Sequence, residues 1–279
     1  MANILYPPAR PQSVGEVLDT VFRIFGRTVV KCVPYAVLAM IARQLPNIYS
    51  LFRGRAPMLL TVQDPVFWLL YVVGALAGVV LLSALLLRQY AMATGHPIDL
   101  RAELATATRR LGAVLLMGLL LMILILISLV PMLLALAFPG WLRVLVVIVM
   151  ALVPSCVFLA FSSAWPIVLL TDRGAAASLE HSARLTWGNW WRLTLIYTVA
   201  LVLLLVLYSL SGLVAVMLAG LLARADLIMI TAITTVVMIV ISAIGTPLYS
   251  ALSLAVLGDL SVRKEGADLE RRIAAPATP

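Results

Sequence analysis

Long runs of apolar residues recur along this chain and are separated by short polar stretches. A run of about 20 apolar residues is long enough, as a helix, to cross the hydrocarbon core of a bilayer, which is about 30 Å thick. Because lipid offers the backbone no hydrogen-bond partner, each run must satisfy its own N–H and C=O groups by forming a helix. The pattern predicts an all-α fold, a polytopic membrane helix bundle whose six transmembrane helices lie at about residues 29–49, 66–92, 111–136, 141–170, 192–219 and 227–257.

A less apolar segment precedes the first, third and fifth predicted spans. Residues 13–27 place apolar side chains at helical spacing on one face and polar side chains on the other. Residues 99–110 end in paired arginines, and residues 174–192 lead into a tryptophan-rich stretch. We expect each segment to form an amphipathic helix that lies in the membrane surface before the chain turns inward.

The order of surface helix, span and span therefore occurs three times, with a period of about 75–86 residues. Arg23, Arg109 and Arg184 take comparable places in these three weak repeats. Internal repeats are common in transporter folds, but duplication alone does not identify a function. We predict a single membrane domain over residues 1–279, composed of a cytoplasmic N-terminus with an amphipathic helix (1–28), a six-span bundle (29–258) and a cytoplasmic tail (259–279).

Turn and cap signals mark several helix ends. Ser13-x-x-Glu16 is a capping-box pattern, and Asp99 is a candidate cap. Asp64-Pro65 combines a preferred N-cap residue with proline at the first helical position. The short turns after the third and fifth spans are predicted at Phe138-Pro139-Gly140 and Arg224-Ala225-Asp226.

Prolines interrupt most of the predicted spans, and each removes a backbone donor and bends its helix. They are Pro34, Pro46, Pro131, Pro154, Pro166 and Pro247. Gly245-Thr246-Pro247, among several hydroxyl side chains, is the strongest candidate for a helix kink. Such a kink either lines a cavity or serves helix packing. In the second span, Gly74-x-x-x-Gly78 is a pattern typical of closely packed helices.

The composition agrees with a membrane protein, since 63% of the residues are hydrophobic, 11% are charged and the mean hydropathy is +1.11. The net charge of +8 does not indicate a nucleic-acid partner, because the basic residues lie mostly at the ends of apolar runs. Counted by predicted side, 15 basic residues lie with the two termini and five lie opposite. The positive-inside rule therefore predicts that both termini are in the cytoplasm.

Basic residues of the three surface segments and of the starts of the spans are candidate contacts for anionic lipid headgroups. They are Arg23, Arg27, Lys31, Arg109, Arg110, Arg184 and Arg192. No catalytic motif accompanies them, and the two cysteines and two histidines have no metal-ligand spacing. Glu180 and His181 are the only adjacent acid–base candidates, so we expect no enzyme activity, no metal and no cofactor.

Three stretches carry a resemblance to a known family: RPQSVGEVLDTVFRIFGRTV, ASLEHSARLTWGNWWRL and TPLYSALSLAVLGDLSVRKEGADLE. Together they resemble the membrane domain of bacterial glycerophosphoryl diester phosphodiesterases and its stand-alone relatives. The ending from Asp259 to Glu270 is the most specific part, while Leu257-Gly258 departs from a tyrosine pair often found there. The resemblance implies the fold and a bacterial inner-membrane location. It implies no catalytic residue, because catalysis in that family belongs to a separate soluble domain.

Three functions follow from these patterns as alternatives. The first is a non-enzymatic membrane protein that binds lipid or a partner protein, either another chain or a second copy. The second is a transporter or lipid-moving protein that uses the kinked sixth span. The third, an intramembrane enzyme built on Glu180 and His181, has the least support.

Overall fold

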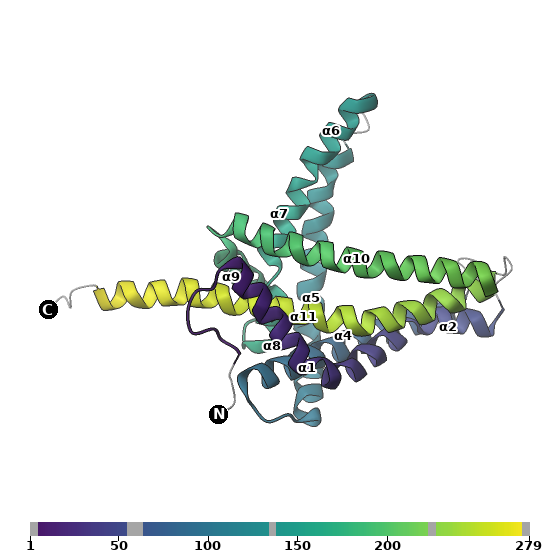
Figure 1. Ribbon diagram of the computed structural model, residues 1–279, viewed down its shortest axis with the longest axis horizontal. Coiled ribbons are helices and arrows are strands. Elements are labelled where there is room, and N and C mark those ends of the chain that lie inside the picture. Colours follow the sequence, from purple (N-terminus) through teal and green to yellow (C-terminus); the bar gives the residue numbers. More distant parts are fainter. Residues whose placement is uncertain (1–4, 55–63, 134–137, 223–226, 275–279) are drawn as a thin grey trace. The chain divides into compact units, whose positions relative to one another are not determined.

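The computed structural model describes residues 5–54, 64–133, 138–222 and 227–274, and every element in these ranges is a helix (Figure 1). The helices are α1 (Val14–Arg43), α2 (Leu45–Phe52), α4 (Pro65–Thr94), α5 (Leu100–Leu133), α6 (Gly140–Met150), α7 (Leu152–Phe161), α8 (Ala164–Leu170), α9 (Ala175–Thr186), α10 (Trp190–Leu222) and α11 (Leu227–Ala274). The predicted all-α class is confirmed.

Six helical stretches are long and apolar enough to cross a membrane. They are Val14–Arg43, Pro65–Thr94, Leu100–Pro131, Gly140–Leu170, Trp190–Leu218 and Ile228–Lys264. Many large apolar side chains on these stretches are exposed, as expected for surfaces that contact lipid tails rather than water. The number of predicted spans therefore matches six candidate spans, but the first is Val14–Arg43 rather than 29–49, because α1 ends at Arg43 and α2 begins at Leu45.

Two of the three expected surface helices are not separate elements. Residues 14–27 are the first turns of α1, and residues 100–110 are the first turns of α5. Neither junction contains a proline or a glycine in a left-handed conformation, so the helix continues into the span. Only the third is a separate helix, α9, because Gly188 with a φ of 88° ends the segment before α10.

The prolines act in two ways. Pro46, Pro154 and Pro166 lie in the first turns of α2, α7 and α8, where the missing N–H would have had no helical partner. The predicted fourth span is accordingly divided into α6, α7 and α8. The prolines at 34, 131 and 247 lie inside α1, α5 and α11, which are each a single helix.

The three predicted caps are confirmed. The Ser13 N–H donates to Glu16 Oε2 over 2.6 Å, and the Glu16 N–H donates back to Ser13 Oγ over 3.3 Å. Asp64 accepts from the Val66 N–H, and Asp99 accepts from the Arg101 N–H, each over 2.9 Å. Gly140 has a φ of 47° at the predicted turn before α6, while the turn at 224–226 lies outside the described residues.

The chain divides into two compact units, with one boundary before α1 and the other four within helices α1, α5, α10 and α11. Unit 1 consists of Met1–Tyr6, Leu18–Thr108 and Thr198–Leu252, and unit 2 of Pro7–Val17, Arg109–Tyr197 and Ser253–Pro279. The single domain expected from the sequence stays a prediction.

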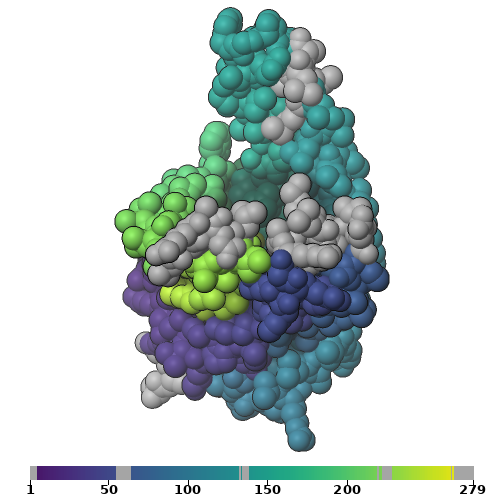
Figure 2. Space-filling view, turned by 90° about the vertical axis from the view of Figure 1, so that its right-hand side faces the viewer, coloured from purple at the N-terminus to yellow at the C-terminus, as the bar shows by residue number. Residues whose placement is uncertain are grey.

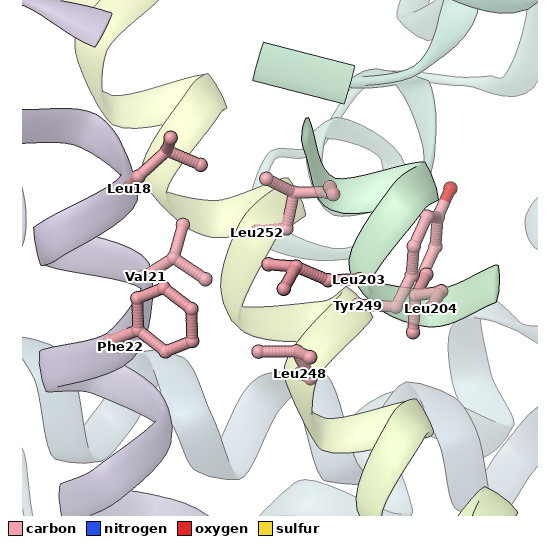
Figure 3. A pocket seen from close by; sticks show the side chains of 9 residues that line it. Leu18, Val21, Phe22, Leu203, Leu204, Leu248, Tyr249 and Leu252 are labelled. Atoms are coloured by element: carbon pink, nitrogen blue, oxygen red, sulfur yellow. The ribbon is translucent and has the colours of Figure 1, made fainter. Parts of the chain in front are cut away.

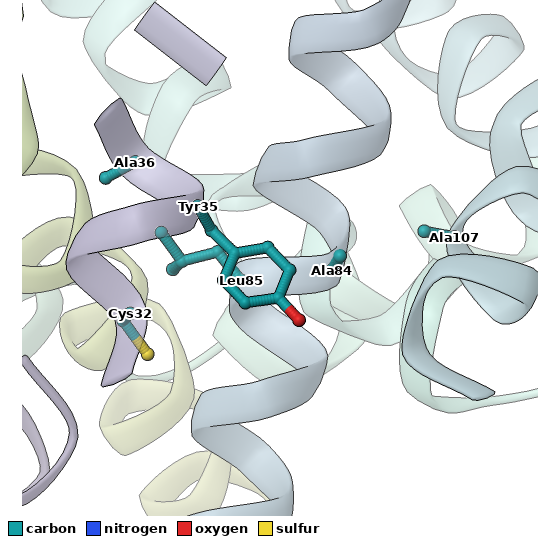
Figure 4. Packing of buried hydrophobic residues seen from close by; sticks show 6 residues of the cluster. All are labelled: Cys32, Tyr35, Ala36, Ala84, Leu85 and Ala107. Atoms are coloured by element: carbon teal, nitrogen blue, oxygen red, sulfur yellow. The ribbon is translucent and has the colours of Figure 1, made fainter. Parts of the chain in front are cut away.

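Unit 1 contains a close approach between α1 and α4. A Cβ atom on Gly74 would lie 2.1 Å from the carbonyl oxygen of Ala42, and one on Gly78 would lie 2.8 Å from Cγ of Arg43. The close-packing role predicted for Gly74-x-x-x-Gly78 is therefore confirmed. Farther along the same two helices, Tyr35 packs in a buried cluster with Leu85 and Ala84 (Figure 4).

Beyond the Gly74 approach, the end of unit 1 is formed by α2 and the first turns of α11. A Cβ on Gly54, just after α2, would lie 4.0 Å from Cδ1 of Ile228. Figure 2 shows this end, with α2 in blue near the start of α11 in yellow-green.

Unit 2 is held together at the broken fourth span. The Ser182 hydroxyl of α9 donates to the carbonyl of Ala160 over 2.8 Å, and the Thr186 hydroxyl lies 3.4 Å from the carbonyls of Leu159 and Ala160. These carbonyls belong to the last turn of α7, where the regular helical hydrogen bonds end, and the Leu159 carbonyl also accepts from the N–H and the hydroxyl of Ser162. Residues 253–260 of α11 are also buried in succession, as in a helix that is enclosed on all sides.

Candidate functional site

The predicted headgroup residues in unit 1 lie on exposed positions of α1. Arg23 is 63% exposed and forms an ion pair with Asp19 over 2.7 Å. Arg27 and Lys31 are also exposed. These three side chains are accessible to a lipid headgroup, and their role stays a prediction.

The predicted residues in unit 2 divide into exposed and paired side chains. Arg109 is exposed, and Arg184 is 75% exposed and ion-paired with Glu180. Arg110 is only 18% exposed and ion-paired with Asp172, which is itself 99% exposed. Exposed ion pairs contribute little to stability and open easily, so Arg184 remains available to a ligand.

Arg192 belongs to a largely buried cluster rather than to the exposed surface. Its guanidinium is 17% exposed and lies 2.9 Å from Asp259, which is 2% exposed. Arg263, one turn after Asp259 on α11, ion-pairs with the same carboxylate over 3.0 Å. The carboxylate also accepts from the Gln12 N–H over 2.8 Å, and both arginines donate to the Gln12 carbonyl.

We call these four residues the Asp259 cluster. It joins the segment before α1, the start of α10 and the last part of α11 within unit 2. Its members come from each of the three stretches that carry the family resemblance. The sequence did not predict this contact, because Gln12 takes part through its backbone and Asp259 is 67 residues from Arg192.

A second buried ionic cluster lies in unit 1. Glu103, in the first turn of α5 and 7% exposed, ion-pairs with Arg88 over 3.0 Å and accepts from the Tyr35 hydroxyl over 2.8 Å. The Arg88 guanidinium also lies over the Tyr35 ring, 4.8 Å from its centroid. We call this set the Glu103 cluster. Glu103 has partners on both α1 and α4, which favours a structural role for the cluster in joining α1, α4 and α5.

The predicted kink at Gly245-Thr246-Pro247 is part of the continuous helix α11. A Cβ on Gly245 would lie 3.3 Å from the Tyr208 hydroxyl, so this glycine allows α10 to approach closely. The carbonyl of Pro247 accepts from the fully buried Gln89 amide over 3.0 Å, and the same amide donates to Thr28 over 3.1 Å. The sequence left open whether this segment lines a cavity or serves helix packing. These contacts are of the packing kind.

The cavity next to this part of α11 is small and apolar (Figure 3). Its volume is about 20 Å³, which is room for about one water molecule. It is lined by Leu18, Val21, Phe22, Ala200, Leu203, Leu204, Leu248, Tyr249 and Leu252 of unit 1. The cavity is therefore too small to hold a lipid chain or a substrate, and it is a packing gap between helices.

A wider, polar depression lies on α9 in unit 2. Its volume is about 250 Å³, and it is lined by Arg173, Ala177, Glu180, His181 and Arg184. We call it the α9 depression. It contains the acid–base pair that the sequence singled out, and its Glu180 is ion-paired with Arg184.

Within the described ranges, no group of three or more histidine, cysteine or acidic side chains is placed to hold a metal ion. Cys32 is buried and Cys156 is exposed. The Asp259 and Glu103 clusters instead bring arginines together with carboxylates, and in the Asp259 cluster also with a backbone carbonyl. Arginines in such arrangements bind or position acidic groups.

The fold defines the class of this chain as a multi-pass membrane protein with six candidate spans. A comparison with protein-family models, with curated proteins and with solved structures finds no match to it. The resemblance to the phosphodiesterase membrane domain accordingly stays a prediction.

Proposed function

We propose that this chain is a non-enzymatic multi-pass protein of a bacterial inner membrane that binds anionic phospholipid. Both termini would lie in the cytoplasm, on the side where basic residues are concentrated. The bacterial origin in this proposal rests on the family resemblance of the three quoted stretches.

The observation that carries the proposal is the exposure of the basic residues near the starts of the spans. Arg23, Arg27, Lys31, Arg109 and Arg184 present their charges outward. Each basic residue near an anionic surface contributes about 1 kcal/mol of attraction. Arg110 and Arg192, which face Asp172 and Asp259, are left out of the proposed headgroup contacts.

Packing contacts occupy α11 around Gly245 and Pro247, which supports lipid binding over transport along this helix. A transporter that uses α11 needs polar groups facing a path, whereas the residues around Leu248 and Leu252 enclose an apolar space. We therefore propose lipid binding rather than transport.

The test is native mass spectrometry of the full chain in mild detergent, with a variant that loses three exposed charges. We expect Arg27→Gln, Lys31→Gln and Arg109→Gln together to weaken retention of phosphatidylglycerol about 100-fold, because each charge contributes about 1 kcal/mol. The matched control is Arg143→Gln, which removes an exposed arginine from the side with few basic residues.

Unchanged lipid retention in the triple variant would contradict the proposal. So would a stoichiometric partner protein in place of lipid, since the chain would then be a subunit or an anchor for that partner.

A further inference from the structure

The α9 depression has the shape of a small ligand site on one helical face. Ala177, Glu180, His181 and Arg184 recur at helical spacing, so their side chains lie along the same side of α9. Ala177 has only a methyl group, which leaves open the space between the longer side chains. Arg173, before the first turn of the helix, completes the rim.

The groups that line the α9 depression carry mostly positive charge. Arg173 and Arg184 are permanently charged, and His181 lies between them along the chain. Glu180 offsets one positive charge through its ion pair with Arg184. Since this pair is exposed at both ends, it exchanges easily for a stronger acceptor.

Tryptophans directly after α9 place the depression near a membrane surface. Trp187 is 72% exposed and Trp191 is 89% exposed, and both belong to unit 2 with α9. Exposed tryptophans of this kind favour the interface between headgroups and acyl chains. A ligand bound beside them is therefore expected to be part of a lipid rather than a freely diffusing ion.

We propose that the α9 depression binds the phosphate-monoester headgroup of a membrane lipid such as phosphatidic acid. This inference rests on the lipid-binding function proposed above and specifies its site. Two arginines, Arg173 and Arg184, line the space, and each guanidinium can donate two parallel hydrogen bonds to a phosphate group. A phosphate monoester has three terminal acceptor oxygens and a charge between −1 and −2 at neutral pH, as a phosphorylated side chain does. A diester headgroup carries only one negative charge, so the arginines of the depression attract it less strongly.

The experiment titrates delipidated full-length protein with phosphatidic acid or phosphatidylglycerol and counts bound lipid by native mass spectrometry. We expect phosphatidic acid to bind more tightly. Arg173→Gln and Arg184→Gln should each weaken its binding about fivefold. Glu180→Gln should strengthen it, because Arg184 is then released from its ion pair. Arg143→Gln is the control and should leave binding unchanged.

Three results would overturn the site. The first is equal binding of the two lipids, and the second is unchanged binding in Arg173→Gln and Arg184→Gln. The third is displacement of the lipid by an equal concentration of inorganic phosphate, which would make the depression a site for soluble anions. The opposite sign expected for Glu180→Gln separates a ligand site from a general loss of folding.

The failure of this site and the failure of the proposed function give different results. If the α9 variants have no effect while the Arg27, Lys31 and Arg109 variant loses phosphatidylglycerol, the lipid-binding function stands and the α9 site is wrong. If neither set changes lipid retention, both proposals are wrong.

Discussion

The two units hold their helices together in different ways. In unit 1, α1 and α4 are unbroken helices that approach so closely at Gly74 that an added Cβ would meet the Ala42 carbonyl. In unit 2, α7 ends at Phe161, and the carbonyls of its last turn accept hydroxyls from Ser182 and Thr186. An unbroken helix satisfies its own backbone, so side-chain volume decides how it packs. A broken helix releases carbonyl groups, so polar side chains are required even in a very apolar chain.

The largest effect is expected in unit 2, at the Asp259 cluster. Asp259→Ala leaves Arg192 and Arg263 largely buried without their acid, and should lower the free energy of unfolding by about 3–5 kcal/mol. The measurement is denaturant-induced unfolding in detergent micelles. Asp172→Ala is the matched control, because this aspartate also pairs with an arginine of unit 2 but is 99% exposed. Equal losses in the two variants would show that burial of the pair has no part in stability.

The next effect tests close packing in unit 1. Gly74→Ala places a methyl group against a backbone oxygen that cannot turn aside, so we expect a loss of about 1–3 kcal/mol in the same unfolding assay. Gly118→Ala, inside α5 with no atom within 4 Å of the added Cβ, should instead be neutral or gain up to about 1 kcal/mol. A stable Gly74→Ala protein would mean that α1 and α4 do not approach as described.

A smaller effect is expected when the hydroxyls of α9 are removed. Ser182→Ala combined with Thr186→Val leaves the last carbonyls of α7 without these donors and should cost about 2 kcal/mol, or about 1 kcal/mol for each side chain. Ser155→Ala is the control, since that hydroxyl donates only to the Ala151 carbonyl of the preceding turn. If Ser155→Ala lowers stability as much as the Ser182→Ala and Thr186→Val variant, then hydrogen bonds to the end of α7 do not have the special role assigned to them in unit 2.

The smallest effect concerns a helix end of unit 1 outside the spans. A hydrogen bond from the Tyr49 hydroxyl, 2.8 Å away, is the main cause that holds the pKa of Asp64 below its ordinary value. Because the folded pKa is lowered, ionised Asp64 stabilises the protein above the unfolded pKa of about 3.9, and this contribution is lost as the pH falls through the folded pKa.

Tyr49→Phe should raise the pKa of Asp64 and reduce the loss of stability as the medium is acidified below about pH 4. Thermal unfolding over a series of acidic buffers measures this difference. Tyr71→Phe, on an exposed position of α4, is the control and should keep the pH dependence of the unchanged protein. An identical acid profile in Tyr49→Phe would mean that this hydroxyl does not stabilise the ionised carboxylate.

The sequence predicts those parts of the fold that depend on neighbouring residues. Six apolar runs, the Ser13–Glu16 capping box and the Asp64 cap all follow from local spacing, and the structure contains them. The continuity of α1 and α5 was missed because a change in amphipathic character suggested a boundary where no helix-breaking residue lies.

The contacts of the candidate sites depend on residues that are distant in the sequence. Glu103 and Tyr35 are 68 residues apart, and the partner of Asp259 in the first segment is a backbone N–H that any residue except proline provides. The α9 depression was predicted only in part, since Glu180, His181 and Arg184 stood out by type but Arg173 did not.

The way in which Asp259, Arg192 and Arg263 hold Gln12 has an evolutionary consequence. Selection acts there on the path of the backbone, because the N–H and the C=O of position 12 make the contacts. We expect homologues of this chain to vary in amino-acid type at position 12, with proline excluded. Asp259 is expected to change only together with Arg192 and Arg263, since its loss alone leaves two largely buried arginines without their shared acid.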